Sequence, residues 1–370
     1  MLGKSRWLAS LLAVGFSLSM GVAGCAEDDG LSTPGRKGQG SNTHTNPAGG
    51  SGGTDVGGGV GREDDSGSAT PTPTPSMAPA SSPTPESHQV TTLSVLSPGA
   101  FTRDAEAAFW VGTSDYGEAS PVHRLIKLNA DGTPAVASFT LAIEPRAMTT
   151  DADRQLFVTD GAQVLKFSPT GAPLGSVTLA SAAKGAGIAW DAVNARLWVL
   201  GGNQVRTVSA DLQPLGSYTL DAPPAALSLD ATGGAWVVGG TVVSRIAANA
   251  ADNTLVWKKS QDLWATNLSA VATANDGAWI AEPGRAVVKL DVDGKSLFQA
   301  QVGVGAAHLS LMADGKVLAA NRQRVDKLAA ASGASLATHT VSAGIDAWLF
   351  SEGSAWYSST SANKLTKSSF

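Results

Sequence analysis

An aromatic residue, or once a leucine, returns about every forty residues through the last three quarters of this 370-residue chain. The spacings are 47, 41, 38, 43, 39 and 38 residues, and the positions are Trp110, Phe157, Trp198, Trp236, Trp279, Leu318 and Trp356. Each stands in a short apolar run after a small or acidic turn. A fixed period of this length, built from short alternating strands, is the signature of a β-propeller. The repeat therefore predicts an all-β fold with seven blades.

The unit is clearest in the third repeat. We expect an inner strand at 187–190, a second strand at 196–200, a third at 204–209 and an outer one at 215–220. Four strands over about forty residues fit one propeller blade. Turn sequences recur between the third and outer strands of other units, namely Asn129-Ala130-Asp131-Gly132, Ser168-Pro169-Thr170-Gly171 and Asp291-Val292-Asp293-Gly294.

The seventh repeat lacks an outer strand, because only one more strand, near 363–368, fits after Trp356. The apolar segment 90–96 precedes the first blade and has no partner of its own. Pairing it with the last strand would close the ring and remove two sheet edges. An open array is the alternative. Six or eight blades also stay open, because the first unit is long and the fourth is irregular around 249–264.

The N-terminus carries a targeting signal. Lys4 and Arg6 precede an apolar stretch, 8–20, that is too short to span a membrane. The sequence Val-Ala-Gly-Cys then ends at Cys25, the single cysteine of the chain. It resembles the lipobox of bacterial lipoproteins, which implies cleavage after residue 24, acylation of Cys25 (palmitate among the acyl groups) and attachment to a bilayer. Ala26 follows, rather than aspartate, which favours the outer membrane. An ordinary secretory signal is the alternative.

Residues 25–89 form the expected lipidated linker, and residues 90–370 the expected propeller domain. The linker is rich first in Gly, Ser and Asn and then in Thr and Pro, so it cannot bury enough apolar surface to fold. Its net charge is −5, whereas residues 90–370 carry only −2. This domain has no basic excess, so we expect no nucleic-acid partner.

In a propeller, the loops that leave the second strands share one face with those that enter the inner strands. The residue three past each repeat aromatic maps this face as Thr113, Asp160, Gly201, Gly239, Glu282, Asn321 and Ser359. Two acids and an amide could hold calcium or magnesium. Alternatively, they start polar turns. Arg146 enters an inner strand on the same face, so the candidate ligand residues are Asp160, Glu282, Asn321, Arg146 and Ser359.

One blade supports a family resemblance. The sequence Asp-Gly-Ala-Trp-Ile-Ala-Glu-Pro-Gly at 276–284, followed by Val-Lys-Leu-Asp at 288–291, resembles the repeat of streptogramin lyase-like and NHL-type propellers. The lyase resemblance implies histidines that enter inner strands and act with acids that end second strands. The seven matching positions hold no histidine; they are Gly99, Arg146, Ala186, Ala225, Ser269, Ala307 and Ile345. His308 lies one residue away, where strand alternation turns its side chain to the opposite side.

Catalytic residues are therefore not assigned, and we expect no resident cofactor. The histidines of the propeller, His123, His308 and His339, lie in different repeats without metal-ligand spacing. The sequence favours a membrane-anchored, non-enzymatic binding scaffold, with the bilayer as one partner and a protein or glycan as another. The alternative is a metal-dependent lyase or hydrolase that uses the mouth around Asp160, Glu282 and Asn321.

Overall fold

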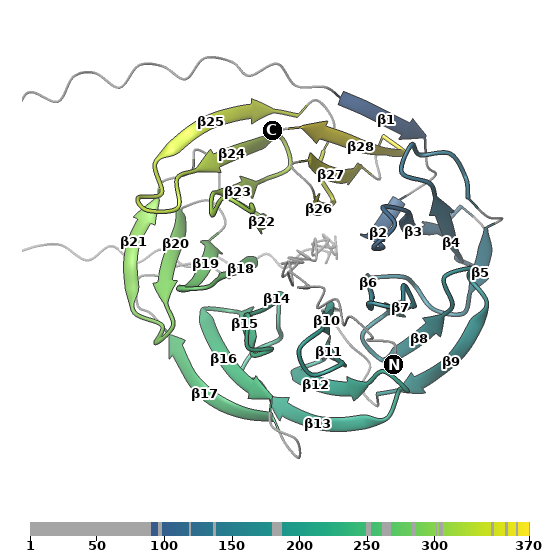
Figure 1. Ribbon diagram of the computed structural model, residues 1–370, viewed down its shortest axis with the longest axis horizontal. Helices are drawn as coiled ribbons and strands as arrows, with labels where there is room; N and C mark the ends of the chain where they lie inside the picture. Colours follow the sequence, from purple (N-terminus) through teal and green to yellow (C-terminus); the bar gives the residue numbers. More distant parts are fainter. Residues whose placement is uncertain are drawn as a thin grey trace, which may run out of the picture. The chain divides into compact units, whose positions relative to one another are not determined.

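The computed structural model is a β-propeller of seven four-stranded antiparallel sheets (Figure 1). It describes residues 90–94 and 98–369, with gaps at 118–119, 136–137, 180–186, 249–252, 261–267, 283–285, 301, 303–305, 342–343, 352–353 and 360–361. Within these residues, no helix has the length and apolar character needed to span a membrane. The predicted signal, Cys25 and the linker lie outside the described residues.

Each blade contributes one strand to each of four concentric rings. The inner strands are β2 (Pro98–Arg103), β6 (Ala147–Thr150), β10 (Gly187–Asp191), β14 (Ala226–Leu229), β18 (Ala270–Ala274), β22 (His308–Leu311) and β26 (Ala347–Ser351). The second strands are β3 (Phe109–Asp115), β7 (Leu156–Thr159), β11 (Arg196–Gly201), β15 (Ala235–Gly239), β19 (Gly277–Glu282), β23 (Val317–Ala320) and β27 (Ser354–Ser359). The third strands are β4 (Val122–Leu128), β8 (Gln163–Phe167), β12 (Gln204–Ser209), β16 (Val242–Ala248), β20 (Ala286–Asp291), β24 (Arg324–Leu328) and β28 (Lys364–Ser369). The outer strands are β5 (Phe139–Leu141), β9 (Pro173–Thr178), β13 (Pro214–Thr219), β17 (Asn253–Ser260), β21 (Ser296–Ala300), β25 (Ser335–Thr340) and β1 (Val90–Ser94).

The ring closes through its first strand, as the sequence predicted. Figure 1 shows β1 outside β28, and the two strands pair antiparallel from Val90 opposite Ser368 to Ser94 opposite Lys364. The last blade therefore combines β26, β27 and β28 with a strand from the other end of the domain. This pairing confirms seven blades and excludes the open array. The four strands expected in the third repeat are also confirmed, each to within one residue at either end.

The repeat aromatics form the core between blades. Trp110, Phe157, Trp198 and Trp279 have no exposed side-chain surface, and Trp236 and Trp356 have almost none. Trp279 shares one buried apolar cluster with Ala270 of its own blade and with Leu309 and Val317 of the next blade. The period seen in the sequence is thus the period at which one sheet must seal against the next.

A cation on the third strand covers the aromatic residue in most blades. The residues directly opposite each other across the strands are Trp110 and Lys127, Phe157 and Lys166, Trp236 and Arg245, Trp279 and Lys289, and Trp356 and Lys367. The charged groups lie 4.9–5.8 Å from the ring centroids, which is the range of cation–π contacts. In the third blade Thr207 stands at this position, and Arg196 supplies the cation from the second strand, with its guanidinium 5.7 Å from the Trp198 ring.

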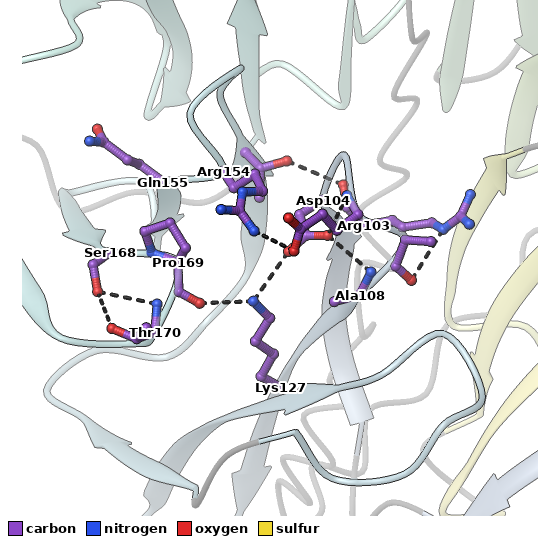
Figure 2. A network of polar contacts seen from close by, with 12 residues as sticks. Arg103, Asp104, Ala108, Lys127, Arg154, Gln155, Ser168, Pro169 and Thr170 are labelled. Carbon is purple, nitrogen blue, oxygen red and sulfur yellow. Dashed lines mark hydrogen bonds and ion pairs between the residues drawn. The ribbon is translucent and has the colours of Figure 1, made fainter.

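The same cations connect neighbouring blades. The Lys127 ammonium donates to the Pro169 carbonyl in the next blade at 2.8 Å and lies 3.3 Å from the buried Asp104 carboxylate (Figure 2). Lys166 repeats the contact one blade further on, donating to the Ala210 carbonyl at 2.8 Å. Both ammonium groups thus find a hydrogen-bond acceptor in the next blade, which a charge shielded from water requires.

Glycines in the turns between third and outer strands complete these contacts between neighbouring blades, which we call the seams. Gly171 has a positive φ of 86°, and a Cβ there would lie 2.4 Å from the Phe139 ring of the preceding blade. Gly294 likewise has a φ of 73°, and a Cβ there would lie 2.8 Å from the Trp257 ring of the preceding blade. Glycine is needed at both turns for its backbone freedom and for the space it leaves to a neighbouring aromatic side chain.

Candidate ligand-binding face

The candidate residues lie on the face made by loops that leave the second strands and loops that enter the inner strands. We call it the entry face. Asp160 directly follows β7, Asn321 follows β23, and Glu282 and Ser359 end β19 and β27. Arg146 directly precedes β6. The positions are equivalent from blade to blade, but the side chains differ in what they contact.

Asp160 and Asn321 each cap a tight turn. Oδ1 of Asp160 accepts hydrogen bonds from the backbone amides of Ala162 and Gln163, both at 2.8 Å. Oδ1 of Asn321 accepts from the amides two and three residues ahead, also at 2.8 Å. Both residues therefore start polar turns, the alternative that the sequence left open, because their short side chains satisfy turn amides.

Glu282 and Ser359 are buried at the ends of their strands. The Glu282 side chain has no solvent exposure, and Ser359 is only 1% exposed. Neither side chain therefore offers an open surface to a ligand in this structure. The equivalent residue of the first blade, Thr113, is buried as well.

Neighbouring backbone fills the space beside the two glycines of this series, so no gap is left there. A Cβ at Gly201 would lie 2.1 Å from the Gly161 carbonyl oxygen in the preceding blade. A Cβ at Gly239 would lie 2.4 Å from the Pro223 carbonyl oxygen. These positions are glycine because backbone passes where a side chain would stand.

Arg146 belongs to an exposed cluster that the sequence did not reveal. Its Nε donates to Oε2 of Glu144 at 2.8 Å, and the Tyr116 hydroxyl donates to Oε1 of the same carboxylate, also at 2.8 Å. The Tyr116 side chain is 63% exposed. We call Tyr116, Glu144 and Arg146 the tyrosine patch.

The protonation states of the tyrosine patch follow from these contacts. Burial alone would raise the pKa of Glu144, but hydrogen bonds from Tyr116 and Arg146, with the Arg146 charge, hold that pKa below its usual range. Partial burial and the Glu144 carboxylate raise the pKa of Tyr116. At neutral pH the patch therefore contains an ionised Glu144, a cationic Arg146 and a protonated tyrosine.

The local backbone holds the tyrosine patch in place. Pro145 is buried against Gly112, where a Cβ would lie 2.5 Å from the proline Cβ, and the Arg146 amide donates to the Thr159 carbonyl at 3.0 Å. On the other side, the His123 ring meets Tyr116 edge-on at 6.4 Å and is bonded through Nδ1 to the Ser114 hydroxyl at 2.9 Å.

The loop that carries Tyr116 is longer than the corresponding loops of the other blades. This loop spans 116–121, six residues between β3 and β4, whereas the corresponding loops of the other blades have two to four. The sequence signal was present, since an aromatic residue stands in a polar loop of the one repeat that is too long. Tyr116 is also one of only three tyrosines in the chain.

His308 is the one candidate histidine near the expected position, and it is buried. It begins β22, is 2% exposed, and burial lowers its pKa to about 4, although Asp346 and the Ile345 backbone act in the opposite direction. The imidazole is therefore neutral at physiological pH. Within the part of the chain that the structure describes, no three His, Cys, Asp or Glu side chains gather in a way that could hold a metal ion.

Comparisons with known proteins identify the fold. No family profile matches the chain, and no curated protein sequence matches it. Among solved structures, it is similar to the Neurospora crassa Pan2 WD40 domain, with a TM-score of 0.62 and 10% identity over 76% of this chain and 95% of that one. The WD40 propeller domain of Doa1 gives a TM-score of 0.60 and 10% identity over 76% and 97%.

Chaetomium thermophilum Raptor is a third similar structure, with a TM-score of 0.61 and 13% identity over 74% of this chain. The match spans only 28% of Raptor. At such low identities the likeness concerns the architecture alone. It shows that the chain folds as a WD40-like, seven-bladed β-propeller.

Proposed function

We propose that this protein is a bacterial envelope lipoprotein, held in the outer membrane through acylated Cys25, whose propeller serves as a non-enzymatic binding scaffold. The lipobox-like sequence before the single cysteine supports the anchor. The tyrosine patch carries the binding function, because it holds an exposed aromatic residue on the entry face through a hydrogen bond to a carboxylate that is itself paired with Arg146. Tyrosine and arginine are enriched at the centres of binding surfaces.

A metal-dependent lyase or hydrolase is less well supported by the geometry. Such an enzyme would use oxygen atoms of Asp160, Glu282 and Asn321 together. Two of these residues direct Oδ1 to backbone amides, and the third is buried. The scaffold is therefore the function that we put forward.

The anchor is tested by changing the acylated residue. We expect the full chain, expressed in a Gram-negative host, to fractionate with the outer membrane and to carry acyl groups on Cys25. The Cys25→Ala variant should move to the soluble fraction. A Cys25→Ala protein that stays entirely in the membrane, or an unmodified mature N-terminus in the wild type, would contradict the proposal.

The scaffold is tested with a photo-cross-linking phenylalanine derivative, which keeps an aromatic ring, at one of two matched positions. Tyr116 on the entry face and Val193 in the turn between β10 and β11, on the opposite face, are 63% and 65% exposed. We expect cross-linked adducts in intact cells from position 116 and few from position 193. Equal yields from both positions, or none from 116, would argue against a ligand on the entry face.

A further inference from the structure

The tyrosine patch combines features that together define a class of ligand. Tyr116 is the only aromatic side chain among the large apolar residues exposed within the described part of the chain. Its hydroxyl is bonded to Glu144, so the ring is held at one end while its surface stays open to solvent. An aromatic ring fixed in this way contributes apolar contact area without a large loss of conformational entropy on binding.

The charge of the patch is balanced. The Arg146 guanidinium pairs with the Glu144 carboxylate at 2.8 Å, and both side chains are partly exposed, at 38% and 33%. A strongly acidic or basic ligand would have to compete with this pair. A neutral ligand can contact it without breaking it, so the charge balance favours a neutral ligand.

The carboxylate also has acceptor capacity beyond the two bonds it makes. One Glu144 oxygen accepts from Tyr116 and the other from Arg146. An ionised carboxylate offers about four acceptor sites, so about two more donors can approach. Neighbouring hydroxyl groups on a ligand would supply such donors.

We infer that the tyrosine patch is a carbohydrate-binding site for a neutral saccharide. The apolar C–H face of a sugar ring would lie on Tyr116, and adjacent hydroxyl groups would donate to Glu144. A sugar ring combines an apolar face with hydroxyl donors at its edge, which matches the ring and carboxylate placed side by side. The inference rests on the proposed scaffold function and assigns it a ligand class.

The experiment uses the full-length protein in detergent on an array of neutral and acidic oligosaccharides. We expect retention on neutral saccharides, and a dissociation constant for the best of them measured by titration calorimetry. Tyr116→Ala should weaken that binding by roughly tenfold or more, because the stacking surface is lost. Glu144→Gln should weaken it as well, since an amide replaces two acceptor oxygens with one. Tyr116→Phe should retain most of the affinity.

The matched control is Val193→Ala, an equally exposed change on the opposite face that should leave saccharide binding unaltered. Thermal melts of all variants establish that they fold. If the wild type binds no neutral saccharide, or if folded Tyr116→Ala binds as well as wild type, the inference is wrong. Protein adducts from a cross-linker at 116 without saccharide binding would overturn the glycan site alone. Absence of both would overturn the scaffold function too.

Discussion

The seams between blades and the entry face use equivalent positions in different ways. In the seams, an aromatic residue on the second strand faces a cation on the third strand in five blades, and in the first two blades that cation donates to a turn of the next blade. On the entry face, Asp160 caps a turn, Glu282 is buried, and Gly201 makes room for backbone. Residues that keep the period thus stabilise the ring, whereas exposed chemistry arises where one blade departs from the period, as at Tyr116.

Opening the seam that closes the ring should destabilise the protein most. Deleting residues 26–97 removes β1 and leaves the edge of β28 unpaired, so we expect unfolding or aggregation. Deleting only 26–85 keeps every described strand, and the melting temperature should stay nearly the same. Differential scanning calorimetry compares the two proteins. Equal melting temperatures would mean that closure by β1 contributes little to stability.

A pair of aromatic substitutions tests whether the seams and the entry face differ in their contribution to stability. Trp279 is fully buried, with the Lys289 ammonium 5.4 Å from its ring and the Phe298 ring at 5.3 Å, so Trp279→Ala should cost about 3–5 kcal/mol in the free energy of unfolding. Tyr116→Ala, on the entry face, should change stability by less than about 0.5 kcal/mol. Urea denaturation measures both. Similar losses for the two variants would remove the distinction between the seams and the face.

The pH dependence of stability should report the burial of His308. Its pKa is about 4 in the folded protein, below the ordinary 6.5, so the unfolded chain binds the proton first as the pH falls. The stability that this difference provides is complete above pH 6.5 and is lost as the pH falls towards 4, by an amount on the order of 3 kcal/mol. His308→Gln should have a flatter profile over this window. Parallel profiles for wild type and variant would show that other groups cause the loss.

Two glycines with similar backbones separate turn strain from seam packing. Gly294 and Gly315 have φ of 73° and 81°, but a Cβ at Gly294 would lie 2.8 Å from Trp257, whereas the nearest atom at Gly315 is 3.6 Å away. Gly315→Ala should cost about 1–2 kcal/mol for the left-handed backbone alone. Gly294→Ala should cost about 1–2 kcal/mol more, because the Trp257 ring must also move. Equal losses in the free energy of unfolding, measured by chemical denaturation, would mean that the Trp257 ring moves aside without cost.

Much of the ring could be predicted from the sequence because its period is local. The seven repeat positions, the four strands of each blade and the closing strand each follow from apolar runs and turns within about forty residues. The contact of Lys127 with Pro169 could not, because it joins two blades whose spacing depends on the packed structure. The sequence nevertheless contains a second repeat, which is the cation on the third strand opposite most of the repeat aromatics.

The candidate site was harder to predict, because equal positions in the repeat do not have equal surroundings. Asp160 is short enough to reach the amides of Ala162, at the end of its three-residue loop, and of Gln163, at the start of β8. Glu282 stands at the same position in its blade but is covered. The tyrosine patch depends on a loop insertion, which lengthens the first repeat, and on Glu144 from the next repeat, which the period did not reveal.

Adding calcium or magnesium should change the stability of the protein least. If Asp160, Glu282 and Asn321 held calcium or magnesium, a hundredfold excess over Kd would stabilise the fold by about 2.7 kcal/mol and raise the melting temperature. We expect a shift of less than about one degree with either ion, because Oδ1 of Asp160 and of Asn321 each already accepts two amide hydrogen bonds and Glu282 is buried. Differential scanning fluorimetry of the full chain, with and without each ion, measures the shift. A rise of several degrees that disappears in Glu282→Gln would show that the turns reopen around a metal. The departures from the period on this face would then belong to a metal-dependent activity, and the scaffold proposal would have to be abandoned.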